Sequence, residues 1–201
     1  MPKSKLPTLE FRTLKKKSYE YIHDEEHKLK ECLDKETRGY AYLSINLNSN
    51  IHVLIPLRSR LKKNSKSSNR LFLYPVEGAK HKNLYCGLDF SKLIIKNTHI
   101  SLEQHTIKLE SYKEFNYYEK HKTEIIEKAK KYIELYINIC KKIEDLDNTE
   151  NGEQEKRISN IKKQLNKYRY STLCNYHEKL GISIDYETVE LIKNSPQGQS
   201  V

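Results

Sequence analysis

The spacing of apolar residues changes about halfway along this 201-residue chain, and this change constrains the fold most strongly. In residues 40–57, apolar side chains alternate with polar ones or run on through short β-compatible segments. In residues 125–143 they recur every three or four positions, as they do on one face of a long helix. A run of strands followed by a run of helices predicts an α+β fold with a helical C-terminal half.

The segment 40–57 predicts a β-hairpin. Residues 40–47 alternate, residues 48–50 (NSN) have turn chemistry because Asn tolerates positive φ, and residues 51–57 continue as a second strand. A basic loop over 58–70 is expected to leave the end of that strand. Further strands are predicted over 9–14, 71–76, 85–90 and 92–96, with a charged helix over 18–33 and short strands and turns over 97–118.

The second half of the chain predicts helices. A long helix with one apolar face breaks at 147–152, and a second helix carrying Ile158, Ile161 and Leu165 is expected to pack antiparallel to it. Ser171 is predicted to cap a short helix over 172–180 that stops at Gly181. We expect one domain over 1–186, β-rich over 9–118 and mainly helical over 119–182, followed by a disordered tail over 187–201.

Charge and composition favour a nucleic-acid partner. The chain has 37 Lys and Arg against 27 Asp and Glu, a net charge of +10, and such a surplus attracts polyanions. The 15 tyrosines suit stacking on unpaired bases, although many of them must lie in the core. The alternative is a basic surface that is merely solvated.

Several classes of protein are disfavoured by what the sequence lacks. The cysteines Cys32, Cys86, Cys140 and Cys174 are too far apart for a zinc or compact disulfide pattern. His99, Glu103 and His105 follow no metal-ligand spacing either, so no metal or cofactor is expected. The N-terminus has no signal-peptide core and no segment reaches ~18 apolar residues, so a cytoplasmic protein without membrane contact is expected.

The basic stretch 58–63 is the best candidate for chemistry. RNA is cleaved without metal when its 2′-hydroxyl attacks the adjacent phosphate, and an enzyme then supplies a base, an acid and cationic groups around the phosphorane. Arg58 can fork onto two phosphate oxygens, Ser59 can donate to one, and Lys62 or Lys63 can hold a proton or a charge. Most basic loops, however, are simply exposed.

Five short pieces of sequence, in this order, resemble the ToxN/AbiQ superfamily of type III toxin–antitoxin toxins, and most closely its TenpN branch. The resemblance spans residues 9–182, and its pieces are 9–14 (LEFRTL), 38–40 (RGY), 55–59 (IPLRS), 87–92 (GLDFSK) and 168–173 (YRYSTL).

The resemblance implies a fold and an activity. Members of the family have a compact, twisted antiparallel sheet, a partial barrel, wrapped by helices. They are sequence-preferring, metal-independent endoribonucleases that act on cellular or phage mRNA and serve in phage defence or plasmid maintenance. A small repeat-derived RNA antitoxin, often a pseudoknot, inhibits the toxin in a ring-like complex.

The resemblance also implies site residues. The family's strand-end motif is a hydroxyl pair followed by a lysine; Ser59 matches it, Arg58 replaces a threonine, and the lysine role stays open among Lys62, Lys63 and Arg60. The early family tyrosine corresponds to Tyr19, or to Tyr21 in another register, and the helical aromatic to Tyr132 or Tyr136. The expected catalytic residues are thus Ser59, Arg58, Lys62 and Tyr19, and the expected RNA-binding residues are Arg38, Tyr40, Arg60, Lys63, Lys66, Arg70 and Tyr136.

Plainer interpretations remain beside these expectations. Tyr40, Tyr132 and Tyr136 fit a buried core, His52 fits a structural histidine, and Asp89 fits a turn or cap. For the whole chain, the alternatives are a basic RNA- or DNA-binding protein without catalysis and a scaffold that binds a partner protein through its helix pair.

Overall fold

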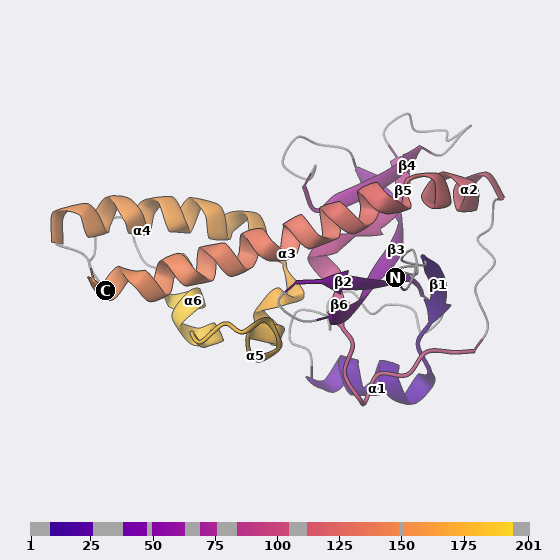
Figure 1. Ribbon diagram of the computed structural model, residues 1–201, viewed down its shortest axis with the longest axis horizontal. Helices are drawn as coiled ribbons and strands as arrows, with labels where there is room; N and C mark the ends of the chain where they lie inside the picture. The colour runs from indigo at the N-terminus through magenta and orange to yellow at the C-terminus, as the bar shows by residue number, and fades with distance from the viewer. Residues whose placement is uncertain are drawn as a thin grey trace, which may run out of the picture.

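A computed structural model describes residues 9–25, 38–47, 50–62, 69–75, 84–104, 112–148 and 151–194. The predicted α+β class is confirmed: an antiparallel sheet forms one end of the molecule, and two long helices extend away from it (Figure 1). The sheet is open and is not closed into a barrel.

The sheet follows the order β1-β2-β3-β5-β4, and β6 pairs with β3. All of its pairings are antiparallel. The strands are β1 (Glu10–Thr13), β2 (Gly39–Asn46), β3 (Asn50–Lys62), β4 (Leu71–Pro75), β5 (Leu84–Asp89) and β6 (Ile94–Ile95).

The predicted hairpin is confirmed, but its second strand is longer than predicted. Register pairs run from Tyr40↔Pro56 to Asn46↔Asn50. Residues 58–62, expected in a loop, are the end of β3, because β5 supplies a partner strand that lies far away in sequence. Leu61 is buried there and pairs with Tyr85.

β3 changes partners along its length. Its first part pairs with β2 up to Pro56, and from Leu57 onward it pairs with β5 on its other edge. Among the described residues, no strand pairs with the β2-side edge of β3 beyond Pro56. The predicted basic stretch therefore begins where one edge of the strand becomes available.

The helices are α1 (Lys16–Glu25), α2 (Tyr112–Lys120), α3 (Lys122–Glu144), α4 (Asn151–Leu165), α5 (His177–Leu180) and α6 (Tyr186–Asn194). The described chain also has 3-10 turns: η3 (Phe90–Lys92) lies between β5 and β6, and η4 (Asp145–Asn148), η5 (Asn166–Tyr168) and η6 (Thr172–Tyr176) lie between helices. α3 crosses the sheet and continues past it with α4 alongside (Figure 1), and α6 packs against α4. The predicted long helix, its partner, the Ser171 cap and the stop at Gly181 are confirmed.

Two predictions about helices were wrong. Residues 112–118, expected as strands and turns, begin α2, which buries Tyr118 against Phe11 and Phe72 at ring distances of 5.5 and 6.3 Å. The tail expected to be disordered from 187 instead forms α6 up to Asn194, because it buries Val189 and Ile192. Residues 195–201 lie outside the described ranges.

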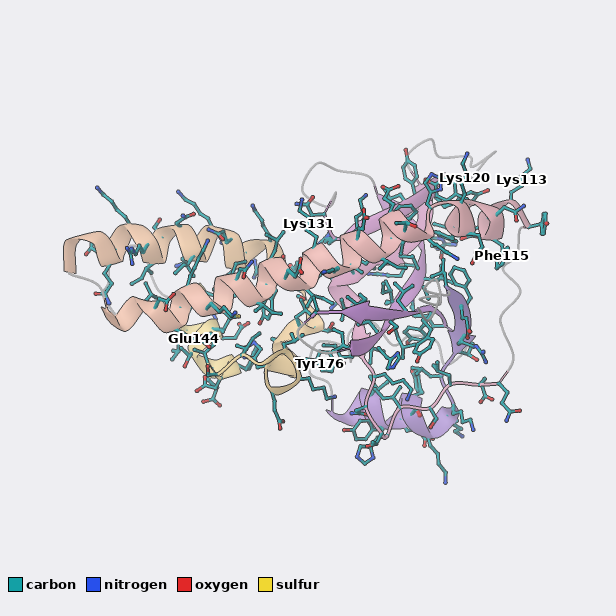
Figure 2. The ribbon with its side chains drawn as sticks, viewed as in Figure 1. Lys113, Phe115, Lys120, Lys131, Glu144 and Tyr176 are labelled. Atoms are coloured by element: carbon teal, nitrogen blue, oxygen red, sulfur yellow. The ribbon has the colours of Figure 1, made fainter. Side chains whose placement is uncertain are left out.

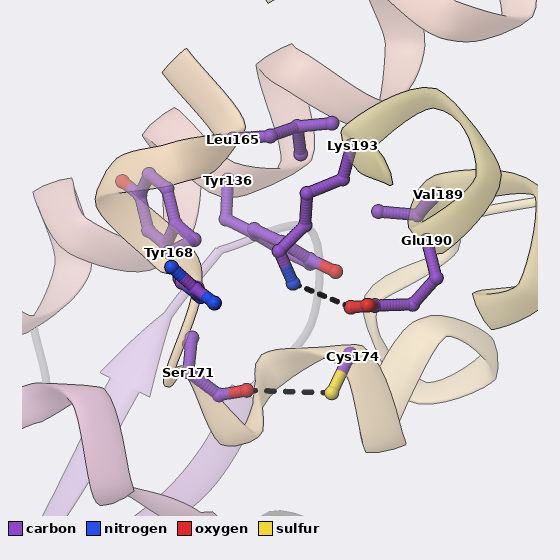
Figure 3. A pocket seen from close by; sticks show the side chains of 9 residues that line it. Tyr136, Leu165, Tyr168, Ser171, Cys174, Val189, Glu190 and Lys193 are labelled. Atoms are coloured by element: carbon purple, nitrogen blue, oxygen red, sulfur yellow. Dashed lines mark hydrogen bonds and ion pairs between the residues drawn. The ribbon is translucent and has the colours of Figure 1, made fainter. Parts of the chain in front are cut away.

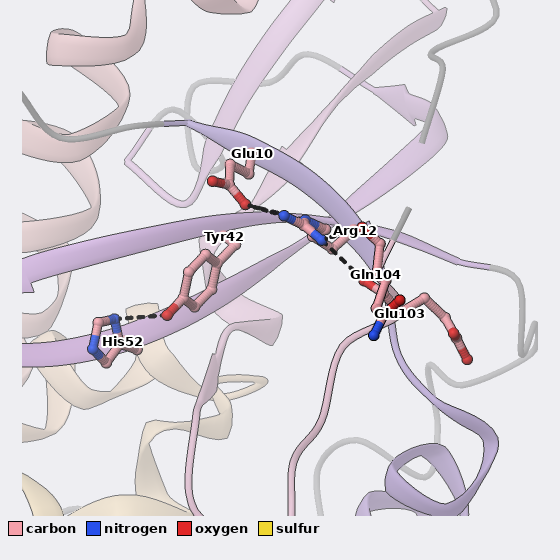
Figure 4. A network of polar contacts seen from close by, with 6 residues as sticks. All are labelled: Glu10, Arg12, Tyr42, His52, Glu103 and Gln104. Carbon is pink, nitrogen blue, oxygen red and sulfur yellow. Dashed lines mark hydrogen bonds and ion pairs between the residues drawn. The ribbon is translucent and has the colours of Figure 1, made fainter. Parts of the chain in front are cut away.

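Polar contacts fix the sheet's first strand to a distant segment. Arg12 pairs with Glu10 at 2.7 Å and donates through Nη1 to the backbone oxygens of Glu103 and Gln104 at 3.1 and 2.6 Å (Figure 4). On the neighbouring strands, the Tyr42 hydroxyl lies 2.9 Å from Nδ1 of His52 (Figure 4). These contacts give His52 a structural partner.

The described cysteines carry free thiols: Cys140 is buried, and Cys86 and Cys174 are half-buried. Cys32 lies outside the described residues. Within the described ranges, none of the helices combines the length and apolar character needed to cross a bilayer.

Candidate functional site

An ion pair between Arg58 and Asp89 lies at the centre of the candidate site. Nη1 of Arg58 is 2.7 Å from Oδ2 of Asp89, and the two side chains are 36% and 5% exposed. The other carboxylate oxygen of Asp89 accepts from the backbone N–H and the hydroxyl of Ser91. The Arg58 guanidinium is therefore held at the sheet surface while part of it stays accessible.

Gly87 allows β5 to bring Asp89 to this position. Gly87 pairs with Arg58 on β3 and with Leu73 on β4, so it lies in the middle of three strands. A Cβ atom there would come within 2.3 Å of the Phe72 carbonyl oxygen. A residue without a side chain is required for this close approach.

Ser59 and Arg60 occupy a β-bulge directly after Arg58. The β3–β5 register shifts between Arg58 and Leu61, and both intervening side chains are exposed. Arg60 has φ of 59°, the only positive φ of a non-glycine residue in the described chain. The left-handed conformation costs such a residue about 1–2 kcal/mol, and bulges often re-aim side chains next to functional sites.

Arg38 brings a second guanidinium beside Arg58. It stands one residue before β2, and its Nη1 donates to the Leu57 carbonyl oxygen at 3.2 Å, just where the β2–β3 ladder has ended. Arg38 is half-buried. Arg70 lies on the other side of Asp89, since its carbonyl oxygen accepts from the Phe90 N–H at 2.8 Å and Leu71 pairs with Asp89.

Tyr132 of α3 connects this end of the sheet to the segment after α4. Its ring lies 6.4 Å from that of Phe90 and 4.8 Å from that of Tyr168, whose hydroxyl donates to the Tyr132 carbonyl oxygen at 3.0 Å. Burial raises the pKa of the Tyr132 phenol, with smaller opposing effects of Ser171 and Arg70. The Tyr132 hydroxyl itself is buried without a hydrogen-bond partner among the described residues.

Three of the short sequence pieces therefore meet in space. Residues 58–59, 87–92 and 168–173 are joined by the Arg58–Asp89 pair, by the Tyr132 contacts, and by a hydrogen bond from Thr172 Oγ1 to the Leu93 carbonyl oxygen. We call Arg38, Arg58, Ser59, Arg60 and Arg70 the arginine cluster.

Two predicted RNA-binding residues were wrong. Tyr40 and Tyr136 are each only 2% exposed, so neither ring is available for a base to stack on. Tyr40 fills the core under the hairpin, and the Tyr136 hydroxyl lies 2.8 Å from His177. An aromatic at a strand start or on a helix stripe is usually core, and that plainer interpretation holds for both.

The structure does not bring Tyr19 to the arginine cluster. Tyr19 lies on α1, which follows β1, and β1 and β4 are at opposite edges of the sheet (Figure 1). The Ser18 hydroxyl of α1 bonds to the backbone of His99 and Ser101. The alternative Tyr21 also lies on α1, with its ring 5.0 Å from that of His99. Lys62 ends β3, but its side chain lies outside the description, as do Lys63 and Lys66.

Sequence reasoning missed the anchoring role of Asp89. The structure confirms it as a cap, because its side chain accepts from the Ser91 N–H at the start of η3. The same carboxylate also binds Arg58, and nothing local in the sequence pairs residues 31 positions apart. The one available signal was Asp89 and Ser91 in alternate positions after a strand, a spacing typical of capping turns.

A small pocket lies where α4 meets α6, and the side chain of Lys193 lines it. Lys193, whose side chain is 9% exposed, pairs with Glu190 at 2.5 Å beside Tyr136, Tyr168 and Cys174 (Figure 3). The Cys174 thiol donates to the Ser171 carbonyl oxygen at 3.3 Å (Figure 3). Both contacts are local, the first within α6 and the second within residues 171–174.

In the described part of the chain, no three His, Cys, Asp or Glu side chains gather as metal ligands would. Of His99, Glu103 and His105, the last lies outside the described residues. No family model matches the chain, and neither a curated protein nor a solved structure matches it.

Proposed function

We propose that this protein is the toxin of a type III toxin–antitoxin system, a metal-independent endoribonuclease that grips RNA at the arginine cluster. The observation that carries the proposal is the fixed Arg58 guanidinium beside an exposed serine on a bulge. A cation anchored by a carboxylate that is 5% exposed is already oriented before a phosphate arrives. The net charge of +10 supplies the general attraction for RNA.

The proposed reaction is a transesterification. The 2′-oxygen of the RNA attacks the adjacent phosphorus, the P–O5′ bond breaks, and the products carry a 2′,3′-cyclic phosphate and a 5′-hydroxyl. The N–H groups of Arg58 that do not face Asp89 donate to the non-bridging oxygens, and Ser59 donates to one of them. Arg38 and Arg70 add positive charge, and Lys62 is the candidate for moving a proton.

The proposed partner is a small structured RNA antitoxin, a pseudoknot cut from a tandem-repeat precursor, held with the toxin in a ring-like complex. An inhibitor RNA that covers the arginine cluster would exclude the mRNA substrate from the same cations. A cytoplasmic location and a role in phage defence or plasmid maintenance belong to this proposal.

Cleavage of RNA in EDTA tests the activity. The purified full-length protein should cut RNA with EDTA present and leave 2′,3′-cyclic phosphate ends, and Ser59→Ala should slow cutting by about 10²–10³-fold, as loss of one oxyanion donor does. Ser44→Ala is the matched control, since Ser44 is another exposed serine of the same sheet that pairs with His52. Loss of cutting in EDTA, or equal rates for both variants, would overturn the proposed mechanism.

RNA binding without cleavage would instead favour the alternative function, a basic RNA- or DNA-binding protein without catalysis. In that case Arg58→Gln should weaken binding, whereas Ser59→Ala should have little effect on any measured property.

A further inference from the structure

The longest stretch without acidic residues in the helical half begins in α4. From Lys156 to His177 the chain contains no Asp or Glu, and this stretch contains Lys156, Arg157, Lys162, Lys163, Lys167 and Arg169. α3 differs, because it intersperses both signs and forms the i,i+4 pairs Glu124–Lys128 and Lys130–Glu134. A solvated helix face normally mixes charges in the way α3 does.

Polar residues of this stretch share one side of the helix. Lys156, Asn160 and Lys163 lie at intervals of four and three residues on α4, Lys167 follows four residues later in η5, and all four are exposed. The opposite side carries Ile161 and Leu165, which are buried. We call these four exposed residues the α4 stripe.

Lys163 of α4 and Lys167 of η5 are like charges four residues apart and repel each other. Cations near a helix C-terminus gain from the helix dipole, which favours Lys163 in the last turn. Lys156, in the first half of α4, lies outside the range of that effect.

Two carboxylates on the neighbouring helices, those of Glu190 and Glu144, bind partners outside the α4 stripe. Glu190 of α6 pairs with Lys193 at 2.5 Å. Glu144 of α3 points toward the segment between α5 and α6, where its Oε1 accepts from the N–H and hydroxyl of Ser183 at 3.0 and 2.8 Å (Figure 2).

After the α4 stripe the chain returns to the sheet, where the arginine cluster lies. After Lys167 the chain reaches Arg169, whose guanidinium lies 5.7 Å from the ring centre of Tyr170, and Tyr170 is 51% exposed. Thr172 follows, and its hydroxyl donates to the Leu93 carbonyl oxygen, four residues after Asp89. An exposed tyrosine beside arginine is a platform on which an unpaired base can stack.

We infer that the α4 stripe and the Arg169–Tyr170 pair form a second RNA contact, which holds the strand that extends away from the arginine cluster. Lys156 and Lys163 are about 10 Å apart along the axis of α4 at 1.5 Å per residue. That length matches roughly three stacked nucleotides. The inference rests on the proposed function, because it concerns a longer part of the same RNA.

RNA length and salt dependence test the inference. The variant Lys156→Gln/Lys163→Gln/Lys167→Gln removes three exposed cations without a large change in helix propensity. Its matched control is Lys15→Gln/Lys16→Gln/Lys17→Gln, which removes three exposed lysines at and before the start of α1, on the far side of the sheet from α4 (Figure 1). Binding to RNA of about 6 and about 30 nucleotides is measured by fluorescence anisotropy over a range of KCl concentrations.

The α4 variant should lose affinity for the long RNA and lower its salt slope by about 2, because each single-strand contact contributes about 0.7. Its affinity for the short RNA and its cleavage of the short RNA should equal those of the wild type. Equal losses in both triple variants, or an unchanged slope in the α4 variant, would overturn the inference while leaving the cleavage proposal intact. A wild-type protein that neither binds nor cuts RNA would overturn both.

Discussion

The Tyr136 hydroxyl oxygen lies 2.8 Å from Nε2 of His177, in the buried region where α3 meets α5. Nδ1 of the same ring lies 2.7 Å from the Ile184 carbonyl oxygen, which can only accept. Nδ1 therefore carries the proton, and Nε2 accepts from Tyr136. This pair ties the long helix to the segment that precedes α6.

Stability should fall as His177 gains a proton. Burial lowers the pKa of His177 below its ordinary value of 6.5, against smaller raising effects from the Ile184 carbonyl, Asp185 and Glu144. Below pH 6.5 the unfolded chain therefore binds more protons at this residue than the folded one does, so the His177 contribution is complete above pH 6.5 and is lost as pH falls toward the folded-state pKa. Urea unfolding of wild type and His177→Gln at several pH values should give a smaller acid-side loss for the variant. Equal losses would contradict this assignment.

Tyr136→Phe should destabilise the protein without weakening RNA binding. The substitution leaves Nε2 of His177 buried without a donor, at a cost of about 1–3 kcal/mol. Because Tyr136 is only 2% exposed, RNA affinity measured by anisotropy below the melting temperature should stay at the wild-type value. A large loss of affinity in a folded variant would restore the idea that this tyrosine contacts RNA.

Arg58→Lys should show whether cleavage depends on the positive charge at this position or on the shape of the guanidinium. Lysine keeps the positive charge but lacks the fork that can bind Asp89 and a phosphate at once. We expect cleavage to fall at least about tenfold, with a change in unfolding free energy below about 1 kcal/mol because Arg58 is partly exposed. Wild-type cleavage by Arg58→Lys would argue against a role for the guanidinium.

Asp89→Asn should lower the free energy of unfolding more than Arg58→Lys does. Asp89 is nearly buried and holds both Arg58 and Ser91, so the variant should lose about 1–3 kcal/mol of stability. Chemical denaturation measures this loss. A stability equal to that of the wild type would mean that the ion pair contributes nothing to the fold.

Two glycines offer a matched comparison. Gly87→Ala places a Cβ atom 2.3 Å from the Phe72 carbonyl oxygen, and forcing β4 and β5 apart should cost about 1–3 kcal/mol or more. Gly181 has φ of +66° and open space within 4 Å of the position that a Cβ atom would take, so Gly181→Ala should cost only about 1 kcal/mol of backbone strain. Only Gly87→Ala should also impair cleavage, since only Gly87 lies across from Arg58. The reverse order of stabilities would contradict the close-packing argument.

Sequence alone predicted the features that depend on local patterns. The hairpin follows from alternation in residues 40–57, and α3 follows from the apolar repeat through Ile125 and Ile143. The Ser171 cap and the Gly181 stop were also visible, because both depend only on neighbouring backbone groups.

The missed features depend on contacts between distant residues. α2 buries Tyr118 against Phe11 and Phe72, two contacts with residues that are distant in sequence. α6 had a usable signal, since Asp185 accepts from the Thr188 N–H as a helix cap and Val189 and Ile192 are three residues apart. Likewise, Arg58 and Ser59 were selected from sequence, whereas the bulge and the Asp89 anchor required β5.

The transfer of β3 from β2 to β5 between Pro56 and Leu57 has a consequence for how such a protein can diversify. Residues 53–56, in the half of the strand that completes the hairpin, are all buried, so packing constrains them. The half that follows has one unpaired edge in the described chain and carries the bulge. Substitutions at the surface can therefore accumulate in one half of a single strand, and under the proposed function these would change which RNA is recognised, while the other half keeps the interior of the protein unchanged.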